Sequence, residues 1–251
     1  MKLYSASPHA NISMIVDSRL RDLLVDITRR TPISHILESG THVGLGSTKF
    51  IAEIFGAQSP PPKRFVTIEA NHRSWHQAKK NLETFPFVTP VWGLSTSRQE
   101  GLRFIQSDPV LLNHHEYPDV FIDDVQDPID FYSREIAGGL GGGRNPLEKI
   151  RRLVDRPRYY EGENLLAKWL GAFRSYKPLV VLDSAGGVGY LEFSTVEQHM
   201  SGHPYFLLLD DICHVKHFRS YEYIHNNSKF AVIGENKDAG WLLAKYQPTA
   251  S

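Results

Sequence analysis

The feature that most constrains the fold is a glycine-spaced turn that follows a short apolar run. Residues 35–38 read His-Ile-Leu-Glu, and Gly40, Gly44 and Gly46 follow before a stretch with helical spacing begins near Ser47. Glycine lets a ligand approach the main chain closely, and the first turn of a helix offers unpaired N–H groups. The stretch is therefore typical of the first strand, loop and helix of a nucleotide-binding type of α/β fold.

Length and composition favour one domain that works on a small molecule. The 251 residues are enough for one α/β domain with an insertion. Lysine plus arginine and aspartate plus glutamate each total 28, so we predict neither a nucleic-acid partner nor a membrane partner. The single cysteine, Cys213, excludes an internal disulfide and indicates a reducing compartment. Without a long apolar run or a leader pattern, we expect a soluble, cytoplasmic protein. A homo-oligomer is compatible with the sequence.

Apolar periodicity predicts helices and strands in alternation. The runs at 179–183 and 205–211 are continuously apolar and end in carboxylates, which suits central parallel strands covered on both faces. The alternation predicts an α/β fold with a Rossmann-like doubly wound sheet, mostly parallel with an antiparallel C-terminal strand, and ligands at the carboxyl ends of its strands. The expected strands are 34–37, 64–70, 87–94, 179–183, 205–211, 230–234 and 241–246, and the expected helices are 12–30, 48–55 and one through Trp75, Ala78 and Leu82.

The alternation lapses between about residues 98 and 177. This segment contains a glycine run at 138–143, which we expect to be flexible, and a helical stretch at 163–173. Because roughly eighty residues are too many for a plain connection, we predict an insertion with structure of its own that lies over the ligand crevice of a single domain spanning 1–251. In an alternative interpretation, residues 120–124 form a further core strand of the sheet.

Two acids indicate the ligand. Glu38 ends the first expected strand and Glu69 the second, where a carboxylate can accept hydrogen bonds from both hydroxyls of an adenosine ribose. That geometry suits NAD and S-adenosylmethionine equally. Glu38 favours S-adenosylmethionine, because a carboxylate beside the glycine loop repels a pyrophosphate and attracts the ammonium and sulfonium groups. The alternative that the glycines form only tight turns stays open.

Three aspartates predict a metal site. Asp183 ends one apolar run, and Asp210 and Asp211 end the next, so parallel strands would bring the three carboxylates to one edge of the sheet. Hard oxygen ligands suit Mg²⁺, and a cation would relieve the repulsion among the carboxylates. The alternative is that Asp210 or Asp211 caps a helix that begins near Ile212.

A basic segment directly after these aspartates offers candidates for a general base. His214 and Lys216 would lie near the metal, and His214 is preferred because the unperturbed pKa of histidine is about 6.5. His42 in the glycine loop is a weaker candidate. A zinc site is not expected, because one cysteine with the spacing of His214 and His217 does not complete a tetrahedral set. The alternative is a solvated basic helix face.

The segment 38–48, Glu69, Asp183 and the pair Asp210 and Asp211 resemble class I S-adenosylmethionine-dependent methyltransferases. Within that class they are most similar to metal-dependent O-methyltransferases of the catechol type and of the type that modifies macrolide sugars. The resemblance covers about residues 32–93 and 177–246 and leaves out the expected insertion. It implies methylation of a hydroxyl on a small molecule, such as a sugar or natural product, with S-adenosyl-L-methionine and Mg²⁺ as cofactors. The alternatives are an NAD-dependent oxidoreductase and a non-catalytic S-adenosylmethionine-binding module.

The resemblance also implies roles for individual residues. Glu38, Gly40, Thr41 and Gly44 would line the methionine portion, Glu69 would hold the ribose, the Gly93 region would approach the adenine, and Asp183, Asp210 and Asp211 would bind Mg²⁺. The complete set expected at the methyl donor is Glu38, Gly40, Thr41, Gly44, Gly46, Ser47, Glu69, Ala70, Gly93 and Asp183.

Two departures from the family pattern matter. Gly186 stands where catechol-type enzymes carry a catalytic lysine, so the base must lie elsewhere, and His214 is the substitute. The glycine-rich segment 183–189 would leave room for a large acceptor, which favours a sugar or a polyketide-like hydroxyl. The residues expected to shape the acceptor pocket are Asp123, Asp124, Tyr159 and Tyr160.

Overall fold

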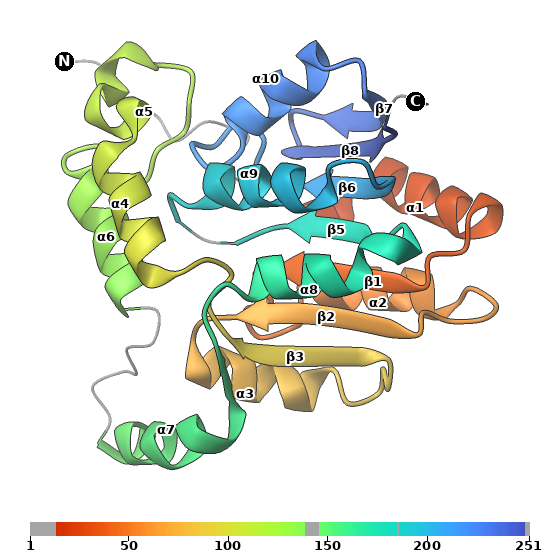
Figure 1. Cartoon of the computed structure of the whole chain (residues 1–251), viewed down its shortest axis with the longest axis horizontal. Helices are drawn as coiled ribbons and strands as arrows, with labels where there is room; N and C mark the ends of the chain where they lie inside the picture. Colours follow the sequence, from red (N-terminus) through yellow and green to blue (C-terminus); the bar gives the residue numbers. More distant parts are fainter. Residues whose placement is uncertain (1–13, 139–145, 185, 249–251) are drawn as a thin grey trace.

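Within the residues that the computed structural model describes, 14–138, 146–184 and 186–248, eight strands form one sheet in the order β4-β3-β2-β1-β5-β6-β8-β7 (Figure 1). Neighbouring strands from β4 to β6 are parallel, and β8 runs antiparallel to both β6 and β7. This confirms the predicted doubly wound, mostly parallel sheet with an antiparallel C-terminal strand. The strands are β1 (His35–Ser39), β2 (Arg64–Glu69), β3 (Val88–Gly93), β4 (Tyr160–Gly162), β5 (Leu179–Leu182), β6 (Tyr205–Leu209), β7 (Phe230–Asn236) and β8 (Trp241–Tyr246).

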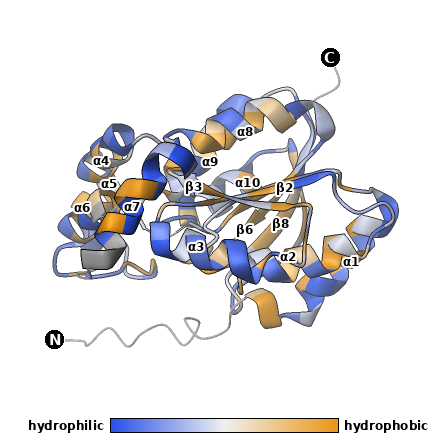
Figure 2. Cartoon of the chain, turned by 90° about the horizontal axis from the view of Figure 1, so that it is seen from below, coloured by the Kyte–Doolittle hydropathy of each residue, from blue (hydrophilic) through white to orange (hydrophobic). Residues whose placement is uncertain are grey.

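The central strands are apolar on both faces because each face lies against its own hydrophobic core. Along β5, Leu179 and Val181 join one core, whereas Val180 and Leu182 join the other. Alternate residues of a strand point to opposite faces, so a strand that is covered on both sides needs an unbroken apolar run. Figure 2 shows the hydrophobic strands in the middle of the fold, between helices that carry hydrophilic residues.

Helices cover both faces of the sheet. The helices α1 (Ser18–Arg30), α2 (Ser47–Gly56) and α3 (His72–Asn81) contribute to one core, and α8 (Leu165–Phe173), α9 (Gly189–Met200) and α10 (Phe218–Asn226) contribute to the other.

Capping side chains fix where two of the helices begin. The carboxylate of Asp17 accepts a hydrogen bond from the backbone N–H of Arg19, which places the start of α1 later than the expected residue 12. A short 3₁₀ turn, η2 (Met14–Val16), precedes α1, and residues 12 and 13 lie outside the described part of the chain. Asn71 caps α3 in the same way.

The first part of the segment 98–177 lies beyond the carboxyl ends of the strands (Figure 1). Here α4 (Arg98–Ser107), α5 (Pro109–Leu112), the 3₁₀ turn η3 (His114–Glu116) and α6 (Pro128–Gly138) form what we call the α4–α6 region. This region has a small core that reaches Val188 and Val215 in the main body. The helix α7 (Pro146–Tyr159) follows, and residues 139–143 of the expected flexible glycine run lie outside the described residues.

The last part of the segment belongs to the layers of the sheet. The strand β4 pairs with β3, and α8 packs against β1, β2 and α9, while a 3₁₀ turn, η4 (Arg174–Tyr176), leads into β5. Residues 120–124 do not form a core strand, because Phe121 makes an isolated bridge with His214 outside the sheet. Among the described residues, no helix combines the length and apolarity needed to cross a lipid bilayer.

Candidate active site

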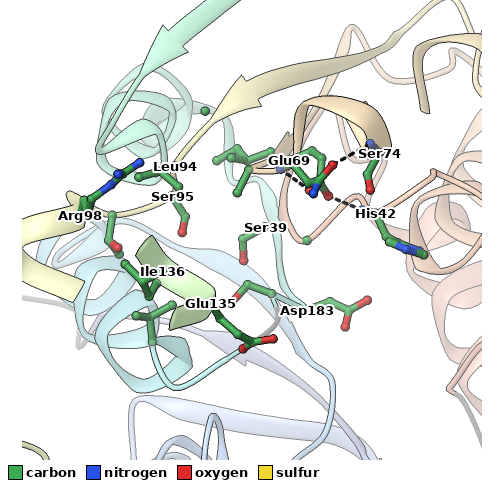
Figure 3. Close-up of a pocket in the computed structure, with 18 of the residues that line it drawn as sticks. Ser39, His42, Glu69, Ser74, Leu94, Ser95, Arg98, Glu135, Ile136 and Asp183 are labelled. Carbon is green, nitrogen blue, oxygen red and sulfur yellow. Dashed lines mark hydrogen bonds between the residues drawn. The ribbon is translucent and has the colours of Figure 1, made fainter. Parts of the chain in front are cut away.

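The carboxyl ends of β1, β2, β3 and β5 open into a cleft of about 570 Å³ (Figure 3). Parallel sheets place ligands at this edge, so the position agrees with the sequence-based expectation. The segment 98–177 was expected to cover the cleft as a whole, and among the described residues its α4–α6 region does so, because Arg98 of α4 and residues 134–136 of α6 line it, whereas β4 and α8 belong to the layers of the sheet. Of the residues expected at the methyl donor, those that line the cleft are Gly40, Glu69, Ala70, Gly93 and Asp183.

Gly40 is the glycine of the loop that faces the site. Its φ is +99°, and a Cβ atom there would lie 2.1 Å from the carbonyl oxygen of Asp183. Its N–H donates a hydrogen bond to the carbonyl of Ile68, 3.0 Å away. Only glycine permits both this backbone conformation and this contact.

The other glycines of the loop do not line the cleft. A Cβ on Gly44 would lie 2.8 Å from Leu82, so this glycine permits α3 to pack against the loop. Gly46 faces open space, and Ser47 begins α2 as expected but is buried away from the cleft. The expectation that the start of α2 presents its N–H groups to the ligand is therefore not met in this structure.

Glu38 is fully buried and does not reach the cleft. Its Oε2 accepts hydrogen bonds from the hydroxyls of Thr48 and Thr67, both at 2.6 Å. Thr41 is also buried, and its hydroxyl lies 2.6 Å from that of Thr67. Thr48 of α2 and Thr67 of β2 thus hold the carboxyl group of Glu38, and Thr41 is held against Thr67, so neither Glu38 nor Thr41 lines the space expected for the methionine portion. Burial raises the pKa of Glu38 to about 7.

The raised pKa of Glu38 predicts a pH dependence of stability. Between about pH 4.5 and 7, Glu38 ionises in the unfolded chain but stays protonated in the folded protein, so the free energy of unfolding falls by about 3 kcal/mol as the pH rises. In Glu38→Gln this fall is absent, whereas Glu69 titrates in both proteins. Urea unfolding at a series of pH values measures the difference between the two proteins. A difference that stays constant from pH 4 to pH 8 contradicts the prediction.

Glu69 is anchored by backbone groups and lines the cleft. Its Oε2 accepts a hydrogen bond from the N–H of His42 at 2.6 Å, and its Oε1 accepts one from the N–H of Asn71 at 2.7 Å (Figure 3). Burial raises its pKa to about 7, although both hydrogen bonds oppose that rise. Each carboxylate oxygen keeps a further acceptor site, so the group is able to receive two hydroxyls from a ligand.

Asp183, Asp210 and Asp211 form an acidic cluster, as predicted. Leu182 of β5 pairs with Leu209 of β6, so the residues after them meet, and one oxygen from each aspartate lies within 4.8 Å of the others. Burial and the neighbouring carboxylates raise the pKa of Asp210 well above its usual value. The capping alternative is wrong, because α10 begins only at Phe218.

Lys216 lies inside the acidic cluster. Its Nζ is 2.7 Å from Oδ2 of Asp211, 3.1 Å from the carbonyl of Ser184 and 3.7 Å from Oδ1 of Asp183. Burial alone would lower the pKa of Lys216, but the three carboxylates raise it overall, so the group stays protonated. The structure therefore does not support Lys216 as a general base. Its ammonium group is also paired with Asp211 and Asp183, two of the three carboxylates that Mg²⁺ would need, so the cluster as it stands does not fit the expected metal.

His214 lies behind the cleft and does not line it. Its Nε2 is 3.0 Å from Oδ2 of Asp123, and its Nδ1 accepts a hydrogen bond from the backbone N–H of Lys216 at 3.2 Å. Because both ring nitrogens have partners within the chain, the structure does not support His214 as the base. The hydrogen bond from His214 lowers the pKa of Asp123. His42, the weaker candidate, does line the cleft.

The residues expected to shape an acceptor pocket do not line the cleft. Asp123 contacts His214, Asp124 lies in the same turn, and Tyr159 and Tyr160 lie at the junction of α7 and β4. In the glycine-rich segment 183–189, Gly186 and Gly187 do not provide free room either. A Cβ on Gly186 would lie 2.8 Å from Oε2 of Glu135, and one on Gly187 would lie 3.1 Å from Tyr132, so side chains of α6 take up that space.

Two acids at the site were not predicted from the sequence. Glu135 of α6 lines the cleft, and burial followed by the nearby Asp123 raises its pKa. Glu192 of α9 is fully buried beneath the cleft, where its Oε2 accepts hydrogen bonds from the hydroxyls of Ser39 and Ser184 at 2.9 and 2.7 Å. The sequence contained a pattern that could have revealed Glu192. This acid lies four residues before Val196 and therefore on the apolar, inward face of the helix.

No protein-family model and no curated protein sequence matches the chain. Among solved structures, a putative O-methyltransferase from Klebsiella pneumoniae is 14% identical, with 93% of this chain and 82% of that chain covered and a TM-score of 0.47. An O-methyltransferase from Bacillus cereus in complex with SAH is 14% identical, with 97% and 92% covered and a TM-score of 0.47. The O-methyltransferase TomG from Streptomyces achromogenes in complex with SAM is 13% identical, with 98% and 92% covered and a TM-score of 0.46.

Proposed function

We propose that this protein is an S-adenosylmethionine-dependent methyltransferase that methylates a hydroxyl group of a small molecule. The observation that carries the proposal is the charge of the cleft beside the glycine loop. Glu69 and Asp183 line it at the ends of β2 and β5, and Glu135 lines it from α6, whereas the N-terminus of α2 does not open into it. The two arginines that line the cleft, Arg98 and Arg134, belong to α4 and α6 and not to the glycine loop. Carboxylates attract a ligand that carries ammonium and sulfonium groups and repel one that carries a pyrophosphate.

The same observation argues against an NAD-dependent oxidoreductase. Dinucleotides place their pyrophosphate on the N–H groups at the start of the helix that follows the glycine loop. Here Gly44, Gly46 and Ser47 lie outside the cleft, so a pyrophosphate in the cleft would lack those donors. The strand order β3-β2-β1-β5-β6-β8-β7, with β4 added at the edge, is the one typical of class I methyltransferases and supports methyl transfer as well.

Different residues of the cleft have different roles in the proposed reaction. Glu69 accepts hydrogen bonds from the ribose hydroxyls, and the Gly40 loop allows the donor to lie against the main chain. Bound S-adenosylmethionine supplies an electrophilic methyl group on a sulfonium. Glu135 faces the cleft with a raised pKa and is the proposed acceptor of the proton that the acceptor hydroxyl loses. Holding the two reactants in line provides much of the rate enhancement.

The acceptor class rests on the resemblance in sequence alone. A sugar or natural-product hydroxyl remains our proposal, but the space along the segment 183–189 is filled by Tyr132 and Glu135 and gives no support for a large acceptor. Mg²⁺ is not part of the proposed mechanism, because Lys216 is paired with two of the three carboxylates that it would need.

Ligand titrations test the proposal. We expect S-adenosylhomocysteine to raise the thermal midpoint of the protein and NADH to leave it unchanged, since a ligand that binds only the folded state stabilises it. Glu69→Gln is expected to weaken S-adenosylhomocysteine binding roughly 10- to 100-fold by calorimetry, because hydrogen bonds to a charged acceptor are lost. Glu53→Gln, at a half-exposed acid on α2, is the matched control and should bind normally.

Each outcome of these titrations decides a part of the proposal. Stabilisation by NADH and not by S-adenosylhomocysteine would overturn it. Normal binding by Glu69→Gln would remove Glu69 from the ribose site. Binding of S-adenosylhomocysteine without turnover on any hydroxylated acceptor, measured as release of S-adenosylhomocysteine from S-adenosylmethionine, would favour the non-catalytic binding module.

A further inference from the structure

Lys216 is surrounded in the way that a small cation is surrounded in a binding site. An ammonium group has three hydrogen-bond donors, and oxygens of Asp211, Ser184 and Asp183 lie 2.7, 3.1 and 3.7 Å from the Nζ of Lys216. The side chain is only 6% exposed. Two of the three carboxylates of the acidic cluster are therefore paired with a positive charge that the chain itself supplies.

The aliphatic part of the Lys216 side chain packs against the start of α9. A Cβ on Gly189, at the start of α9, would lie 2.5 Å from the Cβ of Lys216 and 2.6 Å from its carbonyl oxygen, so the two segments are in direct contact. The backbone N–H of Lys216 donates to Nδ1 of His214, whose Nε2 is fixed by Asp123. These contacts come from α9 and from the α4–α6 region, and they direct the side chain into the cluster.

We propose that Lys216 is the resident cation of the acidic cluster, so that the folded protein binds no divalent metal there and needs none. A divalent ion seeks near-octahedral oxygen coordination at short distances. In this cluster it would have to displace the ammonium from Asp211 and Asp183 or remain beside a like charge. Because the ammonium is buried, its displacement would also leave a positive charge without its partners.

The role of Lys216 is one of positioning, because it does not line the cleft. Asp183 does line it, with its main-chain carbonyl against the loop at Gly40 and its Oδ1 at 3.7 Å from the ammonium. Lys216 thus fixes a cleft-lining acid and lowers the net negative charge around the acceptor. The statement about turnover rests on the proposed methyl transfer, whereas the statement about metal binding does not.

Binding of Mn²⁺ to the purified protein tests the proposal, since electron paramagnetic resonance measures free Mn²⁺ directly. We expect the wild-type protein to leave the free Mn²⁺ signal unchanged. Lys216→Met keeps most of the stem and removes the charge, so it exposes three carboxylates, and we expect it to bind Mn²⁺ at least about tenfold more tightly. Lys216→Arg keeps the charge and should not bind, and Lys168→Met, at an exposed lysine, should match the wild type.

A second variant locates the bound ion. Lys216→Met combined with Asp210→Asn should lose the Mn²⁺ binding that Lys216→Met gains, because a carboxylate of the cluster is removed. Binding that survives in the double variant would place the ion elsewhere and overturn the proposal. A merely structural role of Lys216 predicts that folded Lys216→Met shows no gain in metal affinity, and that result would overturn the proposal too.

Mn²⁺ binding by the wild-type protein tests the proposal even if Lys216→Met does not fold. Mn²⁺ bound by the wild type and lost in Asp183→Asn would overturn the proposal outright. If methyl transfer is found, it should be unchanged by EDTA and by added Mg²⁺. Failure to find any methyl transfer would count against the proposed function and leave the metal-binding result standing.

Discussion

Replacement of Gly40 by alanine is expected to lower the free energy of unfolding by about 3 kcal/mol and to remove binding of S-adenosylhomocysteine. The backbone at Gly40 has φ +99°, which costs an L-residue about 1–2 kcal/mol. The new Cβ would also lie 2.1 Å from the carbonyl oxygen and 2.5 Å from the carbonyl carbon of Asp183. Both atoms belong to the main chain after β5, so no side chain can rotate away, and such overpacking costs about 1–3 kcal/mol more.

The overlap must be relieved by moving β1 and β5 apart. Their last link is the hydrogen bond from the N–H of Asp183 to the carbonyl of Ser39, 3.0 Å long, and both residues line the cleft. Urea unfolding followed by circular dichroism and calorimetric titration with S-adenosylhomocysteine measure the two effects. Gly171→Ala is the matched control, because Gly171 is an exposed helical residue with open space around it, and it should be neutral or stabilise by about 0.5–1 kcal/mol. Equal stability of the two variants would contradict the prediction.

The sheet and the acidic cluster were predictable because both follow from local patterns. The runs that became β5 and β6 are apolar without interruption, which is what two covered faces require. Once the two strands are parallel neighbours, the acids after them must meet at one edge. Their meeting depends only on strand direction and register, and the sequence contains enough information for both.

The direction in which a buried acid points was not predictable, because residues far away in the sequence decide it. Glu38 follows the pattern of a ligand-binding acid, yet Thr67 from β2 and Thr48 from α2 take its hydrogen bonds. The spacing of the glycines likewise does not predict which of them faces the cleft. Gly40 and Gly44 look alike in the sequence, but one meets Asp183 and the other meets Leu82.

The roles of His214 and Lys216 could not be inferred from their position after the aspartates. A basic residue near acids suggests a proton acceptor, but the contacts of Lys216 show a charge that is held in place. His214 is fixed by Asp123, which lies 91 residues earlier in the chain. The helix at 163–173 was expected, but periodicity reveals only that a helix has an apolar face, so it did not show that α8 packs on the sheet.

Replacement of Asp108 by alanine is expected to lower the free energy of unfolding by about 3–5 kcal/mol. The side chain of Asp108 is 0% exposed, and its two oxygens lie 2.9 and 2.5 Å from two nitrogens of Arg219, which is 18% exposed. Removal of one partner leaves a largely buried charge uncompensated, which costs far more than the pair contributes. Asp108 also caps α5, because its Oδ1 accepts a hydrogen bond from the N–H of Val110.

Asp108→Ala should also affect the cleft, because the ion pair between Asp108 and Arg219 joins the α4–α6 region to α10. Arg98 and residues 134–136 line the cleft from that region, so looser docking should weaken ligand binding as well as stability. Asp26→Ala is the matched control, since Asp26 and Arg30 form an exposed pair on α1 at 2.9 Å that contributes about 0.2–1 kcal/mol. Asp108→Ala combined with Arg219→Met should recover part of the loss, because the unpaired guanidinium is gone. If the double variant is no more stable than Asp108→Ala, the unpaired charge is not the cause, and the loss must come from the cap and the packing of α5.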